Sequence, residues 1–340
     1  MTTGPVTIDP PTLEIDHLRL RIPLRGRMGT IIHDVSLIID KGATLALVGE
    51  SGSGKSMTAR AAMGMLIPGA EVQGDIRFSG RSVFRLSEAE LRVYRGHAVA
   101  MIYQNPHAHI NPVRTIGDFL TEALCYQDHL SRAEAEARVI KLLAEVGIPD
   151  GERRLRQYSY QLSGGQLQRV MIVAALATQP RLLLADEPTT ALDVTTQAEV
   201  MAVLAEVRKT RDLSVLLITH DLDLAAATAD RIAVMYAGMI VESAAAADLV
   251  RDPRHPYTVG LLAARPTLEG HGRLRVIPGR PASGFEVGSG CVFAARCPFA
   301  VPLCHQERPA LQPLGGHMVA CHRAEELHGR MEYPAEEAQT

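Results

Sequence analysis

The chain of 340 residues lacks the features of several protein classes. It has no excess of positive charge: its formal net charge is −3 and its Lys and Arg residues are scattered, so it has no general attraction for nucleic acid. No apolar run approaches the roughly 20 residues of a membrane span, and the stretch from Val170 to Thr178 is too short. The opening from Met1 to Pro5 lacks the basic and apolar regions of a signal peptide. We therefore expect a cytoplasmic protein that reaches a membrane only through partners.

Hydrophobic residues make up 46% of the sequence, which is enough for a sizeable core and, at this length, for two or three domains. The chain has no heptad repeats that would predict a long coiled coil. What it does contain is a set of short motifs, several of which directly follow apolar runs.

A glycine-rich loop follows the apolar run Leu45–Val48 and precedes a helix expected to begin near Met57. Its glycines let backbone N–H groups point inward at a phosphate, at the positive end of the helix dipole. Lys55 adds a cation between phosphates, and the Ser56 hydroxyl can bind Mg²⁺. The sequence therefore predicts a nucleoside triphosphate site formed by Gly49, Glu50, Ser51, Gly52, Ser53, Gly54, Lys55, Ser56 and Met57.

Two further apolar runs end in polar residues. The run 181–187 ends in Asp186 and Glu187, and the run 215–220 ends in His220. Continuous apolar runs are typical of a parallel sheet covered on both faces, and such sheets bind ligands at the carboxyl ends of their strands. We expect Asp186 to hold Mg²⁺, Glu187 to take a proton from an attacking water, and His220 to bond the γ-phosphate or that water.

A second anion-binding element lies at Leu162–Gln166, where Ser163 precedes two glycines at the start of an apolar helix. Taken alone, this serine is an ordinary helix N-cap. Beside the glycine loop it has another interpretation: two such domains meet head to tail, and the serine-glycine segment of one closes the nucleotide bound to the other.

In content and in order these motifs resemble those of the ABC ATPase family, over residues from about 12 to 325. The matching segments are the Walker A motif Gly49–Ser56, the Q-loop Tyr103–Pro106, the signature Leu162–Gln166, the Walker B motif Leu182–Glu187, the D-loop Thr190–Asp193 and the switch residue His220. The resemblance implies an α/β P-loop NTPase of ABC type. Such a fold has a mostly parallel sheet, an antiparallel β-subdomain and a helical subdomain, here with a small loop-rich C-terminal extension.

The resemblance also implies a role for each matching residue. Glu187 is the catalytic base, assisted by His220, and Gln104 contacts both Mg²⁺ and the attacking water. Ser56, Gln104 and Asp186 are then the Mg²⁺ ligands. The residues that bind ATP in trans, across a dimer, are Ser163, Gly164, Gly165, Gln166 and Asp193, the last of which couples the two sites.

One family feature is missing. Relatives usually carry an aromatic residue before Walker A on which adenine stacks, but the stretch Leu18–Gly29 has none. Stacking on an aromatic contributes roughly 1–3 kcal/mol per base. Either Arg25, Arg27 or Met28 substitutes for it, or discrimination between bases is loose.

The chain divides into four predicted segments. Residues 1–11 are a proline-rich, disordered leader, 12–265 a nucleotide-binding domain, 266–330 a C-terminal extension and 331–340 a tail. Within the second segment helices are expected at 87–94, 116–127 and 131–146, the last with a capping box beginning at Ser131. A helical subdomain spans about 105–165 and contains the second and third of these helices. In ABC importers a groove near the Q-loop seats a coupling helix of the membrane subunit.

Three segments after His220 resemble dipeptide and oligopeptide importer ATPases: residues 251–262, 277–281 and 290–300. The resemblance implies a peripheral subunit at the cytoplasmic face of the cell (inner) membrane. Its partners would be two transmembrane permease subunits, an extracytoplasmic solute-binding protein and a second ABC ATPase, either a related chain or another copy of this one. Nickel, glutathione or another small solute is the alternative cargo.

Two other functions are compatible with a nucleotide site of this kind. An ABC ATPase acting on nucleic acid would need long coiled coils or zinc modules, for which this sequence has no room. A module that holds ATP without cleaving it is disfavoured by Glu187 and His220.

Four of the five cysteines lie in the extension, at Cys291, Cys297, Cys304 and Cys321. In a cytoplasmic protein clustered thiols indicate metal ligands before disulfides. An all-cysteine set fits a [4Fe–4S] cluster, which members of the resembling subfamily are thought to hold. Zinc, with help from the histidines that follow two of these cysteines, and free structural thiols are the alternatives. Cys125 is expected to be a small buried apolar residue.

Overall fold

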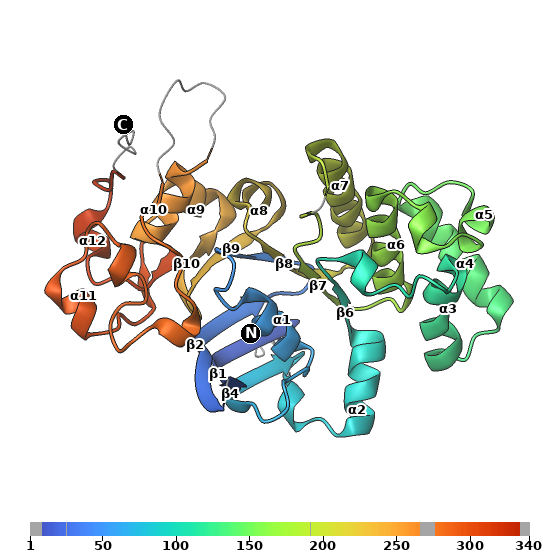
Figure 1. Cartoon of the computed structure of the whole chain (residues 1–340), viewed down its shortest axis with the longest axis horizontal. Helices are drawn as coiled ribbons and strands as arrows, with labels where there is room; N and C mark the ends of the chain where they lie inside the picture. The colour runs from blue at the N-terminus through green and yellow to red at the C-terminus, as the bar shows by residue number, and fades with distance from the viewer. Residues whose placement is uncertain (1–8, 25, 191, 266–275, 334–340) are drawn as a thin grey trace, which may run out of the picture.

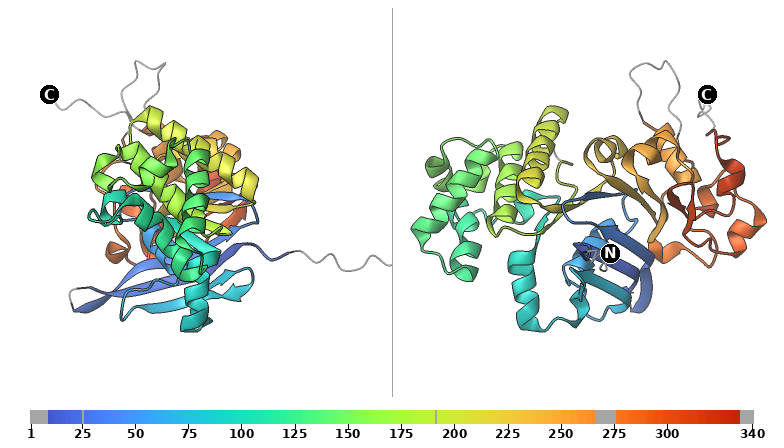
Figure 2. Two further views of the ribbon diagram at one scale, coloured as in Figure 1. Left: turned by 90° about the vertical axis from the view of Figure 1, so that its right-hand side faces the viewer. Right: turned by 180° about the vertical axis from the view of Figure 1, so that it is seen from behind.

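The structure is a computed structural model that describes residues 9–24, 26–190, 192–265 and 276–333. Most of the leader predicted at 1–11 and of the tail predicted at 331–340 lies outside these residues. Figure 1 shows the antiparallel strands at the bottom, a helical region at one end and the C-terminal extension at the other, and the view from behind in Figure 2 shows the same arrangement.

The centre of the molecule is a mostly parallel sheet. Strands β3 (Thr44–Val48), β8 (Ser214–Thr219), β7 (Leu182–Asp186) and β6 (Val99–Ile102) run parallel in that order, and β9 (Arg231–Tyr236) flanks β3 on its other side. Strands β3, β7 and β8 are buried along their whole length. This is why their sequences read as continuous apolar runs.

Side chains from one strand therefore face two different cores. Leu182 and Leu184 of β7 join a core that packs against the antiparallel strands, whereas Leu183 and Ala185 join a core that includes the helical region. Successive side chains of a strand point to opposite faces of the sheet, so alternate residues of β7 belong to different cores.

An antiparallel subdomain packs beside the parallel sheet. It contains β1 (Leu13–Leu24), β2 (Arg27–Ile39), β4 (Glu71–Phe78) and the short β5 (Arg81–Ser82), in the order β5-β4-β1-β2. Its strand β2 pairs with β10 (Met239–Ala245) of the other sheet, at Asp34 and Met239. Strand β10 in turn runs antiparallel to β9.

Several helices begin directly after a side chain that caps them. Helix α1 (Lys55–Ala62) follows β3, α2 (Glu88–Val93) follows β5, and the helical region contains α3 (Ile116–Gln127), α4 (Arg132–Glu145), α5 (Gly151–Leu155), α6 (Gly164–Ala177) and α7 (Val194–Arg211). The capping box predicted at Ser131 is confirmed, and Thr115 and Ser163 form others. Short turns of 3₁₀- or π-helix lie at 83–85, 94–98, 106–108, 159–161, 284–286 (η5) and 294–296 (η6).

The chain after β8 forms α8 (Leu222–Thr228), α9 (Ala246–Arg251), α10 (Pro256–Ala263), α11 (Pro302–Gln306) and α12 (Ala324–Leu327). A hairpin of β11 (Gln312–Leu314) and β12 (His317–Val319) adds to the edge of β10. Behind it Glu242 is fully buried; its carboxylate accepts from the N–H of Arg254 and His255 and lies 2.9 Å from His317 Nδ1. These contacts fix the loop-rich extension to the sheet. The predicted α/β fold class is confirmed.

Among the described residues, no helix is both long enough and apolar enough to cross a membrane.

Candidate functional site

The glycine loop lies between β3 and α1, at the carboxyl end of the sheet. Gly52 and Gly54 have φ angles of 82° and 109°, in the left-handed region that favours glycine. Gly49 packs so tightly on the Met235 carbonyl that a Cβ would clash with it. Helix α1 begins at Lys55, two residues earlier than the predicted Met57, so the loop's last N–H groups belong to its first turn.

Lys55 points back into this loop. Its side chain is buried, and Nζ donates to the carbonyl oxygens of Gly49 at 2.7 Å and Glu50 at 3.0 Å. Burial lowers the pKa of Lys55, while the nearby carboxylates Glu187, Asp186 and Glu50 oppose that shift. The buried Ser53 Oγ has no hydrogen-bond partner among the described residues. A cation, a free hydroxyl and the backbone N–H groups at the start of α1 together fit a phosphate.

Asp186 ends β7 beside the first turn of α1. Ser56 Oγ donates to its Oδ1 at 3.0 Å. Burial raises the pKa of Asp186, and the bond from Ser56 opposes that rise. A carboxylate and a hydroxyl are hard oxygen ligands of the kind Mg²⁺ prefers, and a bound cation would favour the ionised carboxylate.

Glu187 occupies a strained backbone position immediately after β7. Its φ is 48°, which a non-glycine residue adopts rarely, and its N–H donates to the Ile218 carbonyl of β8 at 2.9 Å. Its Oε2 accepts from Gln104 Nε2 at 3.1 Å and from Thr190 Oγ1 at 2.8 Å, and lies 3.4 Å from His220 Nδ1. Side chains that follow β6, β7 and β8 therefore meet at one carboxylate oxygen. No sequence pattern assigns Thr190 to this carboxylate.

The signature segment lies elsewhere in the same chain. Ser163 caps α6, and Asp193 caps α7 by accepting from Thr196 N at 3.0 Å. Both line a pocket of about 510 Å³ together with Gly164, Gly165 and Gln166, and no residue of the glycine loop lines it. The two anion-binding elements are thus separate within one chain.

The C-terminal extension forms an ion pair with the glycine loop. Arg296 of η6 forms a two-pronged ion pair with Glu50, with N–O distances of 2.6 and 3.2 Å, and its side chain is only 7% exposed. Tyr257 of α10 accepts from the Glu50 N–H at 3.0 Å through its hydroxyl. Arg296 lies 246 residues from Glu50 in sequence, and no local pattern signals the pair.

We expect Arg296→Met to lower the free energy of unfolding by about 3 kcal/mol, because it leaves the Glu50 carboxylate half-buried without its partner. The double variant with Glu50→Gln should lose less than the sum of the two single variants. Chemical denaturation measures each value. The exposed pair Arg280–Glu286 in the same extension is the matched control, and its variants should change stability far less. Equal losses at both pairs would contradict a structural role for Arg296.

The four cysteines of the extension lie near one another, but they do not form a metal site in this structure. The N–H of Cys291 donates to the carbonyl of Cys304 at 2.8 Å, and the N–H of Arg323 donates to Cys321 Sγ at 3.4 Å. Burial raises the pKa of Cys297 to about 12 and that of Cys321 to about 11, and neighbouring thiols add to both shifts. Within the described residues, no group of three or more His, Cys, Asp or Glu side chains is placed to hold a metal ion. Cys125 is half-buried against the core.

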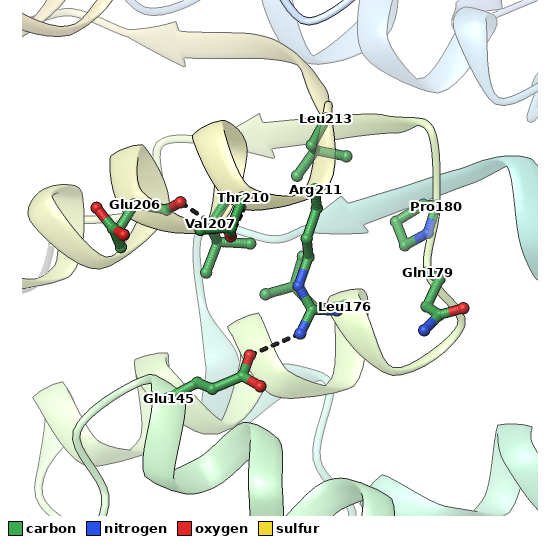
Figure 3. Close-up of a pocket in the computed structure, with 9 residues that line it drawn as sticks. All are labelled: Glu145, Leu176, Gln179, Pro180, Glu206, Val207, Thr210, Arg211 and Leu213. Atoms are coloured by element: carbon green, nitrogen blue, oxygen red, sulfur yellow. Dashed lines mark hydrogen bonds and ion pairs between the residues drawn. The ribbon is translucent and has the colours of Figure 1, made fainter.

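A second pocket, of about 680 Å³, lies at the amino ends of the parallel strands, opposite the glycine loop (Figure 3). Pro180 and Leu213, which precede β7 and β8, line it, and Arg211 crosses it to pair with Glu145 at 2.6 Å. Ligands of parallel sheets bind at the carboxyl ends of the strands, so this pocket at the amino ends is not the nucleotide site.

Family models match two parts of the chain: that of the ABC transporter at residues 32–190, and that of the oligopeptide/dipeptide transporter C-terminal region at residues 241–304. The chain is 44% identical to the oligopeptide transport ATP-binding protein of Bacillus subtilis, over 88% of this chain and 85% of the relative. It is 40% identical to the protein of the same description from Salmonella typhimurium, over 93% of this chain and 95% of the relative. The dipeptide transport ATP-binding protein of Bacillus subtilis is 44% identical over 87% and 90%.

The fold is similar to solved structures of ATP-binding cassettes. One is a dimeric cassette in a post-hydrolysis state bound to ADP and Pi, with a TM-score of 0.62 and 25% identity, covering 69% of this chain and 98% of that one. Another, part of an ABC transporter complex of Clostridium perfringens, has a TM-score of 0.61 and 24% identity, covering 72% and 92%.

Proposed function

The chain belongs to the ABC transporter ATP-binding family, and we propose that it hydrolyses ATP to drive import of di- or oligopeptides across the cytoplasmic membrane. The observation that supports hydrolysis most strongly is the meeting of Gln104, Thr190 and His220 at the Glu187 carboxylate, beside the loop that holds Lys55. The names of the relatives support the peptide cargo.

In the proposed reaction Lys55 and the loop N–H groups hold the β- and γ-phosphates. Ser56, Asp186 and Gln104 would hold Mg²⁺, and the cation would neutralise charge developing on the transferred phosphoryl group. Glu187 takes the proton of the attacking water, while Gln104 and His220 orient that water. Hydrogen bonds from Gln104 and Thr190 hold the Glu187 carboxylate in place before the substrate arrives.

The signature is proposed to act in trans. Ser163, Gly164, Gly165 and Gln166 of one ABC domain close the nucleotide held by Lys55 of another, and Asp193 couples the two sites. The separation of the signature pocket from the glycine loop within one chain supports this arrangement. Closure drives the membrane subunits to open outward, and hydrolysis removes the γ-phosphate that held the domains together.

Replacing Ser163 with Asp should reduce ATP hydrolysis at least about 100-fold, because it puts a negative charge where the partner's γ-phosphate docks. The capping function is kept, since Asp caps helices as well as Ser does. ATP affinity of the single chain should change less than about twofold. Ser131→Asp, the same exchange at the cap of α4, is the matched control and should keep hydrolysis. If Ser163→Asp instead weakens ATP binding by the single chain, the signature contacts the nucleotide of its own chain and does not act in trans.

The proposed partners are two transmembrane permease subunits, an extracytoplasmic solute-binding protein and a second ABC ATPase or another copy of this chain. The chain then binds peripherally at the cytoplasmic face of the membrane. Cells that lack it should fail to take up a labelled dipeptide, and the wild-type chain should restore uptake. Normal dipeptide uptake with reduced nickel or glutathione uptake would support the alternative cargo instead.

We also propose that the extension cysteines bind a metal centre, a [4Fe–4S] cluster or alternatively zinc. The residue types support this, because the extension contains four cysteines and none of them forms a disulfide in the structure. Backbone N–H groups directed at sulfur, such as that of Arg323, stabilise thiolate ligands. The centre would fasten a loop-rich extension with little core of its own.

Anaerobic purification tests this proposal. We expect brown protein with about four irons per chain, and loss of colour in Cys297→Ser. Cys125→Ser is the control and should stay brown. Colourless protein with one zinc would favour the alternative ligand, and metal-free protein at full stability would contradict both.

A further inference from the structure

The segment before the glycine loop has an unusual surface for a nucleotide site. The hairpin of β1 and β2 has no aromatic residue between Leu18 and Gly29, and Ile22 pairs directly with Gly29 across the ladder. Residue 29 thus contributes no side chain at a position where neighbouring strands usually present one.

An aromatic ring from the extension fills that position. A Cβ built on Gly29 would lie 2.6 Å from Cδ1 and 2.9 Å from Cε1 of Phe285, a residue of η5. The ring therefore occupies the space that any side chain at residue 29 would need. Phe285 is half-buried and packs against the core of the antiparallel subdomain.

The same turn and the glycine loop lie against one carbonyl group of β2. Gly284 packs closely on the carbonyl oxygen of Ile31. Ile31 follows Gly29 by two residues and therefore lies on the same face of β2. A Cβ at Gly54 of the glycine loop would lie 3.5 Å from that same oxygen. Gly284 and Gly54 therefore flank one carbonyl group, and Phe285 is the residue that follows Gly284.

Several contacts hold the ring in this position. His33 Nε2 lies 2.7 Å from the Gly284 carbonyl oxygen, and Ser283 forms a capping box with Glu286 around the turn. The Arg296–Glu50 pair anchors the extension to the glycine loop itself. These contacts fix the turn that carries Phe285 beside β2.

We propose that Phe285 of the C-terminal extension supplies the aromatic surface on which adenine stacks. The inference rests on the proposed binding of ATP at the glycine loop. The ring lies at Gly29 of β2, and the Ile31 carbonyl of the same strand lies near Gly54 of the glycine loop, so a base attached to phosphates in that loop would be within reach of the ring. Aromatic faces stack with any base, so Phe285 contributes affinity more than base selectivity. The extension then completes the nucleotide site.

A tryptophan reporter tests the contact directly. The chain has no tryptophan, so Phe285→Trp introduces a single indole whose fluorescence reports its own surroundings. We expect ATP to quench it and tripolyphosphate, which lacks a base, to leave it unchanged. Phe299→Trp in the same extension is the control and should respond to neither. Unchanged Phe285→Trp fluorescence at saturating ATP would overturn the proposal.

Affinity measurements give a second test. Phe285→Leu should weaken ATP binding roughly 5- to 100-fold and leave tripolyphosphate binding unchanged, whereas Phe285→Tyr should bind ATP like the wild type. Equal loss for both ligands would show that the substitution perturbs the phosphate loop, and no loss for either would exclude stacking; both results overturn the proposal. If the wild-type chain itself does not bind ATP, the proposed function fails, and this result is distinct from the others.

Discussion

Glu187→Gln should abolish ATP turnover and keep ATP binding. The substitution preserves size and the capacity to accept from Gln104 and Thr190, but an amide cannot take a proton from water. Loss of a positioned general base lowers the rate by about 10²- to 10⁴-fold. Phosphate release under saturating MgATP measures the rate, and equilibrium binding of labelled ATP measures the affinity.

The matched control for Glu187 is another carboxylate-to-amide exchange away from the site. Glu145→Gln on α4 removes an exposed carboxylate that pairs with Arg211 in the pocket at the amino ends of the strands, and should hydrolyse ATP at the wild-type rate. Retained hydrolysis in Glu187→Gln would show that another group acts as the base.

Lys55→Met should remove most ATP affinity, and with it hydrolysis. The buried ammonium group that donates to Gly49 and Glu50 is the cation placed to bond phosphate oxygens. A hydrogen bond to a charged group contributes about 1.5–3 kcal/mol, so binding should weaken roughly 10- to 150-fold. Isothermal titration with MgATP measures the change.

Lys141→Met on the exposed side of α4 is the control for the lost charge and should bind ATP normally. Because the Lys55 ammonium is desolvated, its replacement by an apolar side chain is compatible with folding. Wild-type affinity in a folded Lys55→Met protein would mean that ATP binds elsewhere.

Local patterns in the sequence predicted much of the fold. The apolar runs before Gly49, Glu187 and His220 are neighbouring parallel strands, because burial on both faces leaves a continuous apolar signature. The helix predicted at 116–127 has those bounds, since Thr115 caps it.

The sequence did not predict contacts between distant segments. The Arg296–Glu50 pair and the packing of Phe285 on Gly29 join residues separated by most of the chain, and neither has a periodicity or spacing that could indicate it. Thr190 was likewise recognised as part of a motif, but its bond to Glu187 depends on the turn that follows β7. The sequence showed that an aromatic residue is missing before the glycine loop. It could not show which residue takes its place, because an aromatic residue from anywhere in the chain could do so.

The central claim is that this chain cleaves ATP and does not merely hold it. The most direct measurement is phosphate release from ATP by the purified chain, alone and together with its co-purified transport partners, with and without Mg²⁺. The account predicts Mg²⁺-dependent release that saturates with ATP and stops in the Glu187→Gln variant. Saturable ATP binding without phosphate release in either preparation would contradict it and identify the chain as a module that binds ATP without hydrolysing it.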